Sequence, residues 1–369
     1  MSTWNKEVAD IEVYPDMFCY VGHTFDSDDT YEFLLCPQVG DIKEFVVRML
    51  DKVGVMGYNV KGYDAHVIEH IIKRVHDFDN MNNVAICNEI FKFSKDLIHT
   101  EKKPWLKKPM LPYFDIYKLH HFDNRNKSCS LKWIEFALRM SNISDLPYPP
   151  EVPLGTKEKI DEVVKYCHHD VKATKMFIEA SEKEIVLRRE LSKKYELDLY
   201  DVNESKMGAE IVLKKVSEKM NVPSWEVRKM RTWRPEGIVL KDIILPYVSF
   251  RTQEFNELLD KYMSKTVKDT KGELKHRQWF KGIPYDYGTG GLHACTKSGS
   301  FHADDEYAII DIDVTSYYPN IAIRNKQYPR HLGTSFCYVY EGMFEERKLH
   351  PKGTPENYVL KIALNGVFG

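Results

Sequence analysis

Apolar and polar positions alternate along the first part of the chain in a way that predicts a mixed α/β domain. Two apolar runs, 8–13 and 17–21, indicate strands joined by a turn, and a third strand is expected at 53–58. Helical spacing follows at Ala65, Ile68, Ile71, Ile72 and Val75. Strand, turn and helix go on alternating to about residue 180, which is typical of an α/β fold.

The pattern changes after residue 180. Residues 157–189 predict one long helix or two, and 186–285 indicate a mainly helical connector. A Gly-rich stretch that begins near residue 282 predicts a loop, and 307–314 predicts a strongly apolar strand. We therefore expect an α/β domain over 1–185, the connector, and a further domain over 286–369.

The composition favours a folded protein with more than one domain. The chain has 369 residues, of which 43% are hydrophobic and 29% charged, so a packed core is expected. Its seven cysteines are scattered and form no CxxC pair, which argues against a zinc knuckle or a disulfide framework. No signal peptide and no apolar run of about 18 residues is present. We expect a cytoplasmic protein without a membrane span, in the host cytoplasm if it is viral.

Charge is distributed unevenly along the chain. The formal net charge is -2, but residues 1–100 carry 9 basic and 17 acidic side chains, whereas residues 101–369 carry 44 and 38. An acidic first part followed by a mildly basic remainder suits a carboxylate metal site beside a surface that binds a polyanion. A solvated acidic face would give the same asymmetry.

Three segments of the first domain carry acids at suggestive spacings. Asp10 and Glu12 lie two apart in a predicted strand and share a face, where they repel unless a cation lies between them. A turn after the third strand places Asp64 at the start of a helix. Tyr166 and Asp170 lie four apart on one helical face. Taken singly, a solvated strand face, an ordinary helix cap and a neutral helix face are the better explanations.

Together, D-x-E, N-x4-D and Y-x3-D in this order resemble the three exonuclease motifs of the DEDD superfamily, in its tyrosine subclass. The resemblance implies a ribonuclease H-like fold with 3′–5′ exonuclease activity, in which Tyr166 helps to hold the attacking water and Asn59 contacts DNA. It also implies two Mg²⁺ or Mn²⁺ ions about 3.5–4 Å apart, which neutralise the attacking and leaving oxygens. The ligands would be Asp10, Glu12, Asp64 and Asp170.

A further segment of the first domain, Ser-Leu-Lys-Trp-Ile from residue 130, resembles the motif that contacts single-stranded primer ends in related phage polymerases. This implies DNA contacts for Ser130 and Leu131, with Phe122 or Trp133 available to stack on a base. Leu131 could equally be a core position of a helix. The adjacent His168 and His169 receive no role.

The string Asp-Ile-Asp-Val-Thr-Ser-Tyr-Tyr-Pro at 311–319 resembles motif A of family B DNA polymerases. The resemblance implies that Asp313 binds both catalytic metals, that the Val314 carbonyl binds one, and that Tyr318 excludes a 2′-hydroxyl. Tyr317 replaces the usual Leu of this motif. A buried strand that enters a Pro-terminated turn is the alternative.

Residues 361–369 resemble motif B, K-x3-N-S-x-Y-G, with Gly366 in place of Ser. Lys361 and Asn365 would present one helical face to an incoming triphosphate, and Arg347 matches the family's second triphosphate-binding position. A solvated helix face is the alternative for Arg347.

Between the two domains, 287–291 resembles the Y-x-G-G loop of the same family. This implies DNA contacts for Tyr287, Gly290 and Gly291, since glycines allow phosphate to approach the backbone closely. A plain turn is the alternative.

The combined resemblance covers most of the chain and points to the phage branch of family B. Polymerisation also needs a second palm carboxylate, usually in a D-T-D hairpin after motif B, which the sequence does not contain. We expect the amino-terminal part of a replicative DNA polymerase, truncated or split, with no nucleotidyl transfer by itself. Its partners would be primer-template DNA, single-stranded 3′ ends, dNTPs and, if split, a C-terminal polymerase fragment. The alternatives are a free-standing exonuclease with an inactive polymerase remnant and a non-catalytic DNA-binding or assembly subunit.

Overall fold

The computed structural model describes residues 5–27, 29–51, 53–101, 104, 106–268, 273–288 and 291–366. The chain divides into two compact units. Unit 1 comprises Met1–Lys215 together with Gly342–Gly369, and unit 2 comprises Val216–Glu341. The last part of the sequence therefore returns to the unit that contains the first part.

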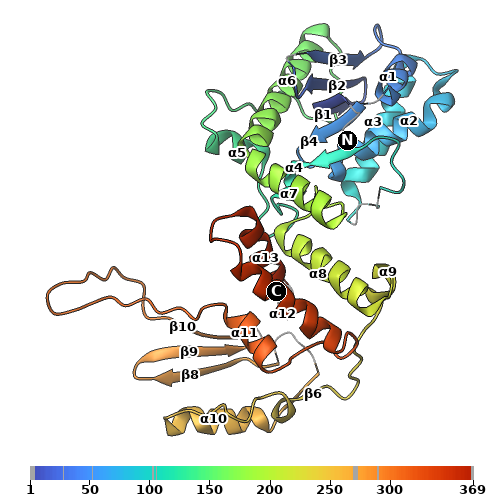
Figure 1. The fold of residues 1–369 in the computed structure, drawn as a ribbon. Helices are drawn as coiled ribbons and strands as arrows, with labels where there is room; N and C mark the ends of the chain where they lie inside the picture. The colour runs from blue at the N-terminus through green and yellow to red at the C-terminus, as the bar shows by residue number, and fades with distance from the viewer. Residues whose placement is uncertain are drawn as a thin grey trace. The chain divides into compact units, whose positions relative to one another are not determined.

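A five-stranded mixed sheet forms the centre of unit 1, in the order β3-β2-β1-β4-β5 (Figure 1). Strand β1 pairs antiparallel with β2 and parallel with β4, and β4 pairs parallel with β5. The predicted mixed α/β class is confirmed, as are the first three predicted strands. The bounds are β1 (Asn5–Tyr14), β2 (Met17–Thr24), β3 (Thr30–Leu35), β4 (Val53–Gly57) and β5 (Tyr113–Asp115).

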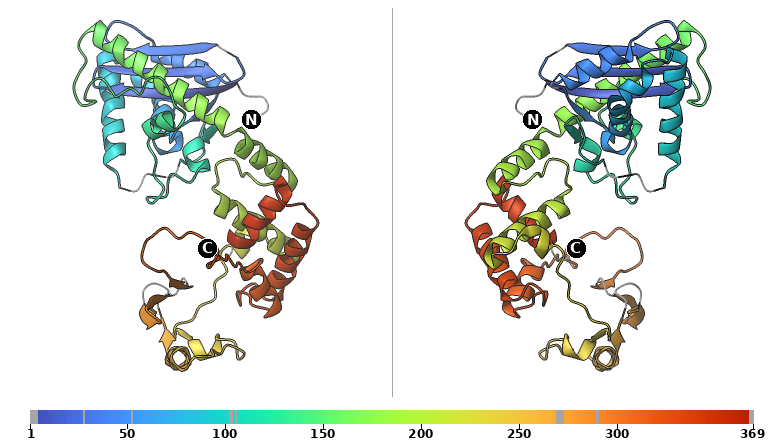
Figure 2. Two further views of the ribbon diagram at one scale, coloured as in Figure 1. Left: turned by 90° about the vertical axis from the view of Figure 1, so that its left-hand side faces the viewer. Right: turned by 90° about the vertical axis from the view of Figure 1, so that its right-hand side faces the viewer.

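Helices cover both faces of this sheet (Figure 2). Side chains alternate along β1, so that Ala9 and Ile11 are buried with α1, α2 and α3, whereas Val8 and Tyr14 are buried with α4, α5 and α6. Asp10 and Glu12 belong to the second face by the same alternation. The helices are α1 (Ile42–Leu50), α2 (Asp64–Arg74), α3 (Asn83–His99), α4 (Ile116–Leu119), α5 (Leu131–Ala137) and α6 (Lys157–Ala180), with 3₁₀ turns at Val60–Gly62 and Val75–Phe78.

Unit 1 extends beyond residue 185, the predicted end of the first domain. A second helix, α7 (Glu182–Tyr195), follows α6, which settles the two alternatives for 157–189 in favour of two helices. Arg188 of α7 is 2% exposed and donates hydrogen bonds to the backbone carbonyls of Leu119 and Val202, each at 3.1 Å. Because a buried guanidinium needs acceptors, these bonds fix α7 and the segment after it to the sheet domain.

The helix of the predicted motif B also packs within unit 1. A Cβ added at Gly208 would lie 2.6 Å from the Cα atom of Ala363, so the helices that carry them approach closely. Glu346 forms ion pairs with Lys194 and Lys215, each at 3.4 Å. The division into units therefore differs from the predicted boundaries at 185 and 285. The helices concerned are α8 (Glu204–Met220), α12 (Thr334–Lys348) and α13 (Pro355–Gly366).

Unit 2 contains a three-stranded antiparallel sheet in the order β10-β9-β8 and a two-stranded sheet of β6 and β7. The predicted connector over 186–285 is thus helical in its first part and includes short strands later. The elements are α9 (Ser224–Val227), β6 (Ile238–Val239), a 3₁₀ turn (Leu240–Asp242), α10 (Gln253–Met263), β7 (Thr266–Val267), β8 (His276–Phe280), β9 (Ile283–Gly288), β10 (Gly291–Ala294) and α11 (Tyr317–Arg324).

Two predictions for this part of the chain are wrong. The Gly-rich stretch expected to be a loop forms β9 and the start of β10, where Tyr285 packs against Phe255 with ring centres 5.4 Å apart. The apolar segment 307–314, expected to be a strand, is assigned to no strand. Its side chains have high strand propensity, but a strand also needs a pairing partner, and the described residues provide none.

None of the helices in the described ranges combines the length and the apolar character that crossing a lipid bilayer requires.

Candidate active site

A cleft of about 540 Å³ opens in unit 1 near the carboxyl ends of β4 and β5. Loops that follow parallel strands meet at this edge of a sheet, which is where open α/β sheets usually bind ligands. The cleft is lined by residues from β1, the turn after β4, and the helices α2, α3, α4, α5 and α6. We call it the acidic cleft: Asp10, Ile11, Glu12, Tyr58, Asn59, Gly62, Tyr63, Asp64, Ile98, Tyr117, Cys129, Leu131, Asp170 and Thr174.

Strand β1 places the first two carboxylates. Asp10 and Glu12 share a face, as predicted, and Ile11 between them points into the core on the other side. The parallel pairing of β1 with β4 ends at Val8, so both acids lie past it, where the sheet opens into the cleft. At Asp10 and Glu12, β1 is therefore paired with β2, its antiparallel neighbour, and no longer with β4.

The turn after β4 places Asn59 and Asp64. Asn59 adopts a left-handed backbone conformation, with φ 58° and ψ 22°. A Cβ at Gly62 would lie 2.3 Å from Asn59 Oδ1, so a larger residue there would displace the Asn59 side chain. Asp64 is the first residue of α2 rather than its cap, and it is 6% exposed. A carboxylate in the first helical turn is favoured by the helix dipole.

Helix α6 supplies the remaining predicted residues. Tyr166 and Asp170 lie one turn apart, and Asp170 lines the acidic cleft. The carboxylate oxygens of Asp10, Glu12 and Asp170 all lie within 4.8 Å of one another. Acids separated by about 160 positions in the sequence are thereby brought together.

Burial raises the pKa of all four carboxyl groups. For Asp64 and Asp170 burial raises the pKa to about 7, and for Asp170 the Asp10 carboxyl adds to the increase. Burial, followed by repulsion from a neighbouring acid, also places the pKa values of Asp10 and Glu12 well above 3.8 and 4.5. The neighbouring acid is Asp64 for Asp10, and Asp10 for Glu12. The cleft therefore opposes full ionisation unless a cation balances the charge.

Two buried oxygens in the cleft have no hydrogen-bond partner within the described ranges, Asp64 Oδ1 and Asp170 Oδ1. Leaving a buried polar atom without a partner is unfavourable by about 1–3 kcal/mol, and more when the group is charged. Carboxylate oxygens are also the ligands that hard divalent cations prefer. The donor set of the acidic cleft thus fits a divalent metal ion.

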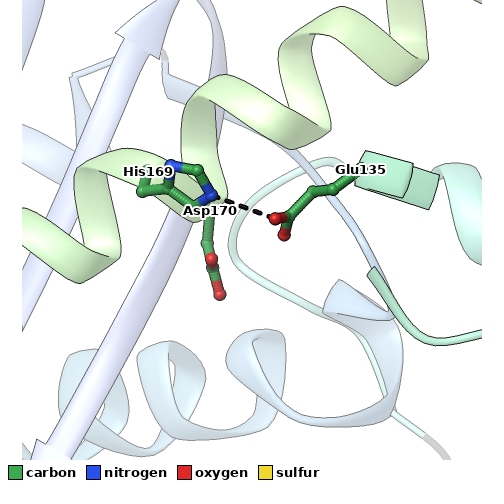
Figure 3. A group of neighbouring side chains, drawn as sticks. All are labelled: Glu135, His169 and Asp170. Atoms are coloured by element: carbon green, nitrogen blue, oxygen red, sulfur yellow. Dashed lines mark hydrogen bonds and ion pairs between the residues drawn. The ribbon is translucent and has the colours of Figure 1, made fainter. Parts of the chain in front are cut away.

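Beside this cluster lies a second group that could hold a metal: Glu135, His169 and Asp170 (Figure 3). His169 Nε2 is 3.0 Å from Glu135 Oε2, and Glu135 is 1% exposed. Because Asp170 belongs to both groups, the Glu135–His169 pair links α5 to a predicted metal ligand. Sequence reasoning left His169 unassigned and missed Glu135. The His next to Asp170 was visible, but nothing in the sequence indicated that residue 135 would lie opposite it.

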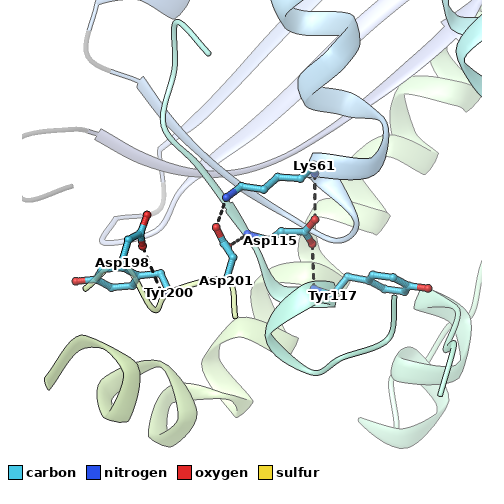
Figure 4. Close-up of polar contacts among 6 residues, drawn as sticks. All are labelled: Lys61, Asp115, Tyr117, Asp198, Tyr200 and Asp201. Atoms are coloured by element: carbon cyan, nitrogen blue, oxygen red, sulfur yellow. Dashed lines mark hydrogen bonds and ion pairs between the residues drawn. The ribbon is translucent and has the colours of Figure 1, made fainter. Parts of the chain in front are cut away.

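A network of hydrogen bonds centred on Asp115 holds the backbone of the turn that follows Asn59 (Figure 4). Asp115 is fully buried and accepts hydrogen bonds from the backbone N–H groups of Lys61 at 3.0 Å and Tyr117 at 3.1 Å. Asp201 accepts from the backbone N–H of Asp115 at 2.7 Å and forms an ion pair with the Lys61 ammonium group. Burial raises the pKa of Asp115 to about 6. Sequence reasoning missed all of these residues because the contacts join distant segments.

The predicted DNA contacts of the first domain lie close together. Asn59 and Leu131 line the acidic cleft, so Leu131 is not simply a core position. Ser130 caps α5, since its hydroxyl accepts a hydrogen bond from the backbone N–H of Trp133 at 3.3 Å. Trp133 is 64% exposed, whereas Phe122 packs among other aromatic rings. DNA binding by these residues remains a prediction.

The predicted polymerase residues are divided between the two units. In unit 2, Asp313, Val314 and Tyr318 are exposed, Tyr287 is in β9 and Gly291 begins β10. Gly290 lies outside the described residues. In unit 1, Arg347 is in α12, where its Nε lies 3.5 Å from Asn357 Oδ1, and Lys361 and Asn365 are exposed one turn apart on α13. Their roles in nucleotide and DNA binding remain predictions.

Comparison with known protein families and with curated proteins finds no match to this sequence. Any assignment of function therefore rests on the motifs and on the geometry of the site.

Proposed function

We propose that the chain is the amino-terminal part of a phage-type family B DNA polymerase and that its acidic cleft is a 3′–5′ exonuclease site. The observation that carries the proposal is the convergence of Asp10, Glu12, Asp64 and Asp170 in one cleft without basic partners among its lining residues. Four such acids can all be ionised at neutral pH only when bound cations balance their charge.

The fold supports the same proposal. The sheet order β3-β2-β1-β4-β5, with an antiparallel hairpin on one side and parallel strands on the other, is compatible with the ribonuclease H-like fold that the motifs imply. Asp10 and Glu12 lie on the central strand, Asp170 lies on α6, which packs across that strand, and Asp64 begins α2.

The four carboxylates would hold Mg²⁺ or Mn²⁺, two ions per site. When bound, the ions supply positive charge to the attacking and leaving oxygens of a phosphodiester. Tyr166 keeps its hydroxyl proton at neutral pH, as an ordinary tyrosine does, and burial followed by the charge of Asp170 raises its pKa further. Its hydroxyl is hydrogen-bonded to the Asp170 carboxyl group and would also contact a water or phosphate in the cleft. Ile98 and Leu131 give the cleft apolar surface on which the terminal nucleotide can lie.

Nucleotidyl transfer would use motif A together with a partner segment that supplies the second palm carboxylate. Residues 307–314 support this part of the proposal, because their apolar side chains are exposed: Ile310 is 77% exposed and Ile312 is 85% exposed. Apolar residues in an unpaired segment next to Asp313 are typical of a strand completed by another chain or segment. Arg347, Lys361 and Asn365 would then bind the dNTP.

A free-standing exonuclease is the second candidate. The acidic cleft is assembled, whereas the motif A segment is unpaired. Together these two observations favour a free-standing exonuclease over a non-catalytic assembly subunit.

The test uses a single-stranded oligonucleotide labelled at its 5′ end. With Mg²⁺ the full chain should produce a ladder shortened from the 3′ end, and EDTA or a 3′-terminal phosphorothioate should suppress it. Asp10→Ala with Glu12→Ala should abolish the ladder, while Asp161→Ala, at an exposed acid on α6, should not. Equal shortening by the double variant would refute the site.

The polymerase part of the proposal needs a separate measurement. Primer extension should appear only when a C-terminal polymerase fragment is added, and Asp313→Ala should abolish it. Extension by the chain alone would contradict this part.

A further inference from the structure

Two segments of unit 2, 225–234 and 324–331, are joined although about a hundred positions separate them. Thr232 Oγ1 lies 2.9 Å from His331 Nδ1 and accepts a hydrogen bond from the backbone N–H of His331 at 3.2 Å. Arg231 is close enough to lower the pKa of His331, after the larger effect of burial. The two segments therefore form one surface, which we call the basic–aromatic surface.

This surface is strongly positive. The two segments contain seven basic residues and a single acidic residue, Glu226, in a chain whose net charge is -2. All seven cations are exposed. Five of them form no ion pair with a carboxylate within the ranges that the structure describes: Arg231, Arg234, Arg324, Lys326 and Arg330. Unbalanced cations on two adjoining segments favour a polyanionic ligand.

The same surface exposes aromatic rings. Trp233 is 84% exposed, Trp225 is 62% exposed and Tyr328 is 40% exposed. The Lys229 ammonium lies 4.7 Å from the ring centre of Trp225. Aromatic rings between cations are the usual means by which proteins bind single-stranded nucleic acid, because bases stack on the rings while cations contact phosphates. A duplex would offer only its phosphates, since its bases are already stacked.

We propose that the basic–aromatic surface binds single-stranded DNA, with bases stacked on Trp233 and Trp225 and phosphates held by Arg231, Arg234 and the cations of 324–331. The choice of DNA rests on the proposed function. Arg324 ends the short helix α11, whose first turn carries Tyr318, so the bound strand would lie close to motif A. The surface uses none of the residues of the acidic cleft.

The test measures binding of fluorescein-labelled (dT)20 to the full chain by anisotropy, in EDTA so that no hydrolysis occurs. Trp233→Ala should weaken binding about tenfold, the loss expected for one stacked base. Trp233→Phe, which keeps a ring, should restore most of the affinity. Trp279→Ala is the matched control, because Trp279 is 60% exposed in β8 of the same unit. It should bind as the parent does.

Charge is tested separately. Arg231→Ala with Arg234→Ala should weaken binding and reduce the slope of log K against log salt by about 2, since two phosphate contacts are lost. Melting temperatures of all variants should match the parent, because the altered side chains are exposed.

The outcomes decide the proposal. Parental affinity for both Trp233→Ala and the double arginine variant would overturn it, and so would tighter binding of the (dT)20·(dA)20 duplex or of (rU)20. If hydrolysis fails while (dT)20 still binds in a Trp233-dependent manner, the exonuclease proposal fails and this one stands. If hydrolysis occurs but (dT)20 binding does not depend on Trp233 or the arginines, the exonuclease proposal stands and the proposed role of the basic–aromatic surface fails.

Discussion

The acidic cleft of unit 1 and the 307–314 segment of unit 2 both carry closely spaced acids at motif-like positions, yet only the first is a built site. In the cleft, Asp10 and Glu12 are held by a paired strand, and Asp64 is 6% exposed. In the segment, Asp313 is exposed in an unpaired stretch.

Motif-like spacing of acids in the sequence is therefore not sufficient to bury them in a common site. The cleft acids have raised pKa values because burial removes water from several of them together. In the 307–314 segment, by contrast, Asp311 and Asp313 are exposed to water.

The largest effect is expected for Asp64→Asn. Losing one of four converging carboxylates should lower the rate of Mg²⁺-dependent hydrolysis by about 10³-fold, or ~4 kcal/mol of transition-state stabilisation. Without metal, the same variant should melt at a higher temperature than the parent, because it removes repulsion with Asp10. Single-turnover rates and thermal melts in EDTA measure the two effects. A variant that lost activity and also melted lower would contradict this explanation.

Glu135→Ala should weaken Mn²⁺ binding to the cleft by about 10–100-fold, the range typical when a group that orients a metal ligand is removed. Its partner His169 precedes Asp170 directly, so loss of the Glu135 carboxylate frees the backbone turn that carries Asp170. Glu135→Gln keeps an acceptor for His169 and should retain most of the affinity. Calorimetric titration with Mn²⁺ distinguishes the variants, and equal affinity for Glu135→Ala and the parent would exclude a positioning role.

Stability without metal should fall as the pH rises from about 4 to 7. The folded-state pKa of Asp64 and of Asp170 is about 7, above the ordinary value of 3.8, so the folded state binds more protons than the unfolded state in this window. Mg²⁺ binds the ionised form and should remove most of this loss at pH 8. Melting temperatures at pH 5.5 and 8, in EDTA and in Mg²⁺, measure it. A melting temperature in EDTA that rises with pH would show the opposite sign.

Lys61→Met should lower the free energy of unfolding by about 1–2 kcal/mol, because it leaves Asp201 without its cation beside the buried Asp115. Lys132→Met is a matched control, since its partner Asp145 is 88% exposed. That variant should change stability by less than about 0.5 kcal/mol. Urea unfolding of both variants tests the difference, and equal losses would show that burial of the pair does not matter.

The smallest effect is expected for Asp313→Ala in the chain alone. An exposed side chain in an unpaired segment should change the free energy of unfolding by less than about 0.5 kcal/mol and leave hydrolysis unchanged. The same two assays apply. A marked loss in either would show that the segment contributes to the folded chain in a way that its exposure does not indicate.

Local patterns predicted the elements that depend on neighbouring residues. The period of two at 8–13 and the helical spacing around Ile68 and Ile71 identified β1 and α2, since side-chain alternation follows from backbone geometry. The same rule correctly placed Asp10 and Glu12 on one face. Where an element needed a distant partner, the local pattern was insufficient: 307–314 has strand-forming residues but no strand, and the Gly-rich stretch at 283–288 became one by pairing.

The residues alone were enough to show which acids are available and on which faces they lie, because spacing along a strand or helix fixes the direction of each side chain. Long-range packing was needed to place Glu135 opposite His169, Asp201 beside the Asp115 backbone, and α13 against α8. These contacts join segments that are far apart in the chain, and their free energy depends on burial and on a partner's position, neither of which local spacing encodes.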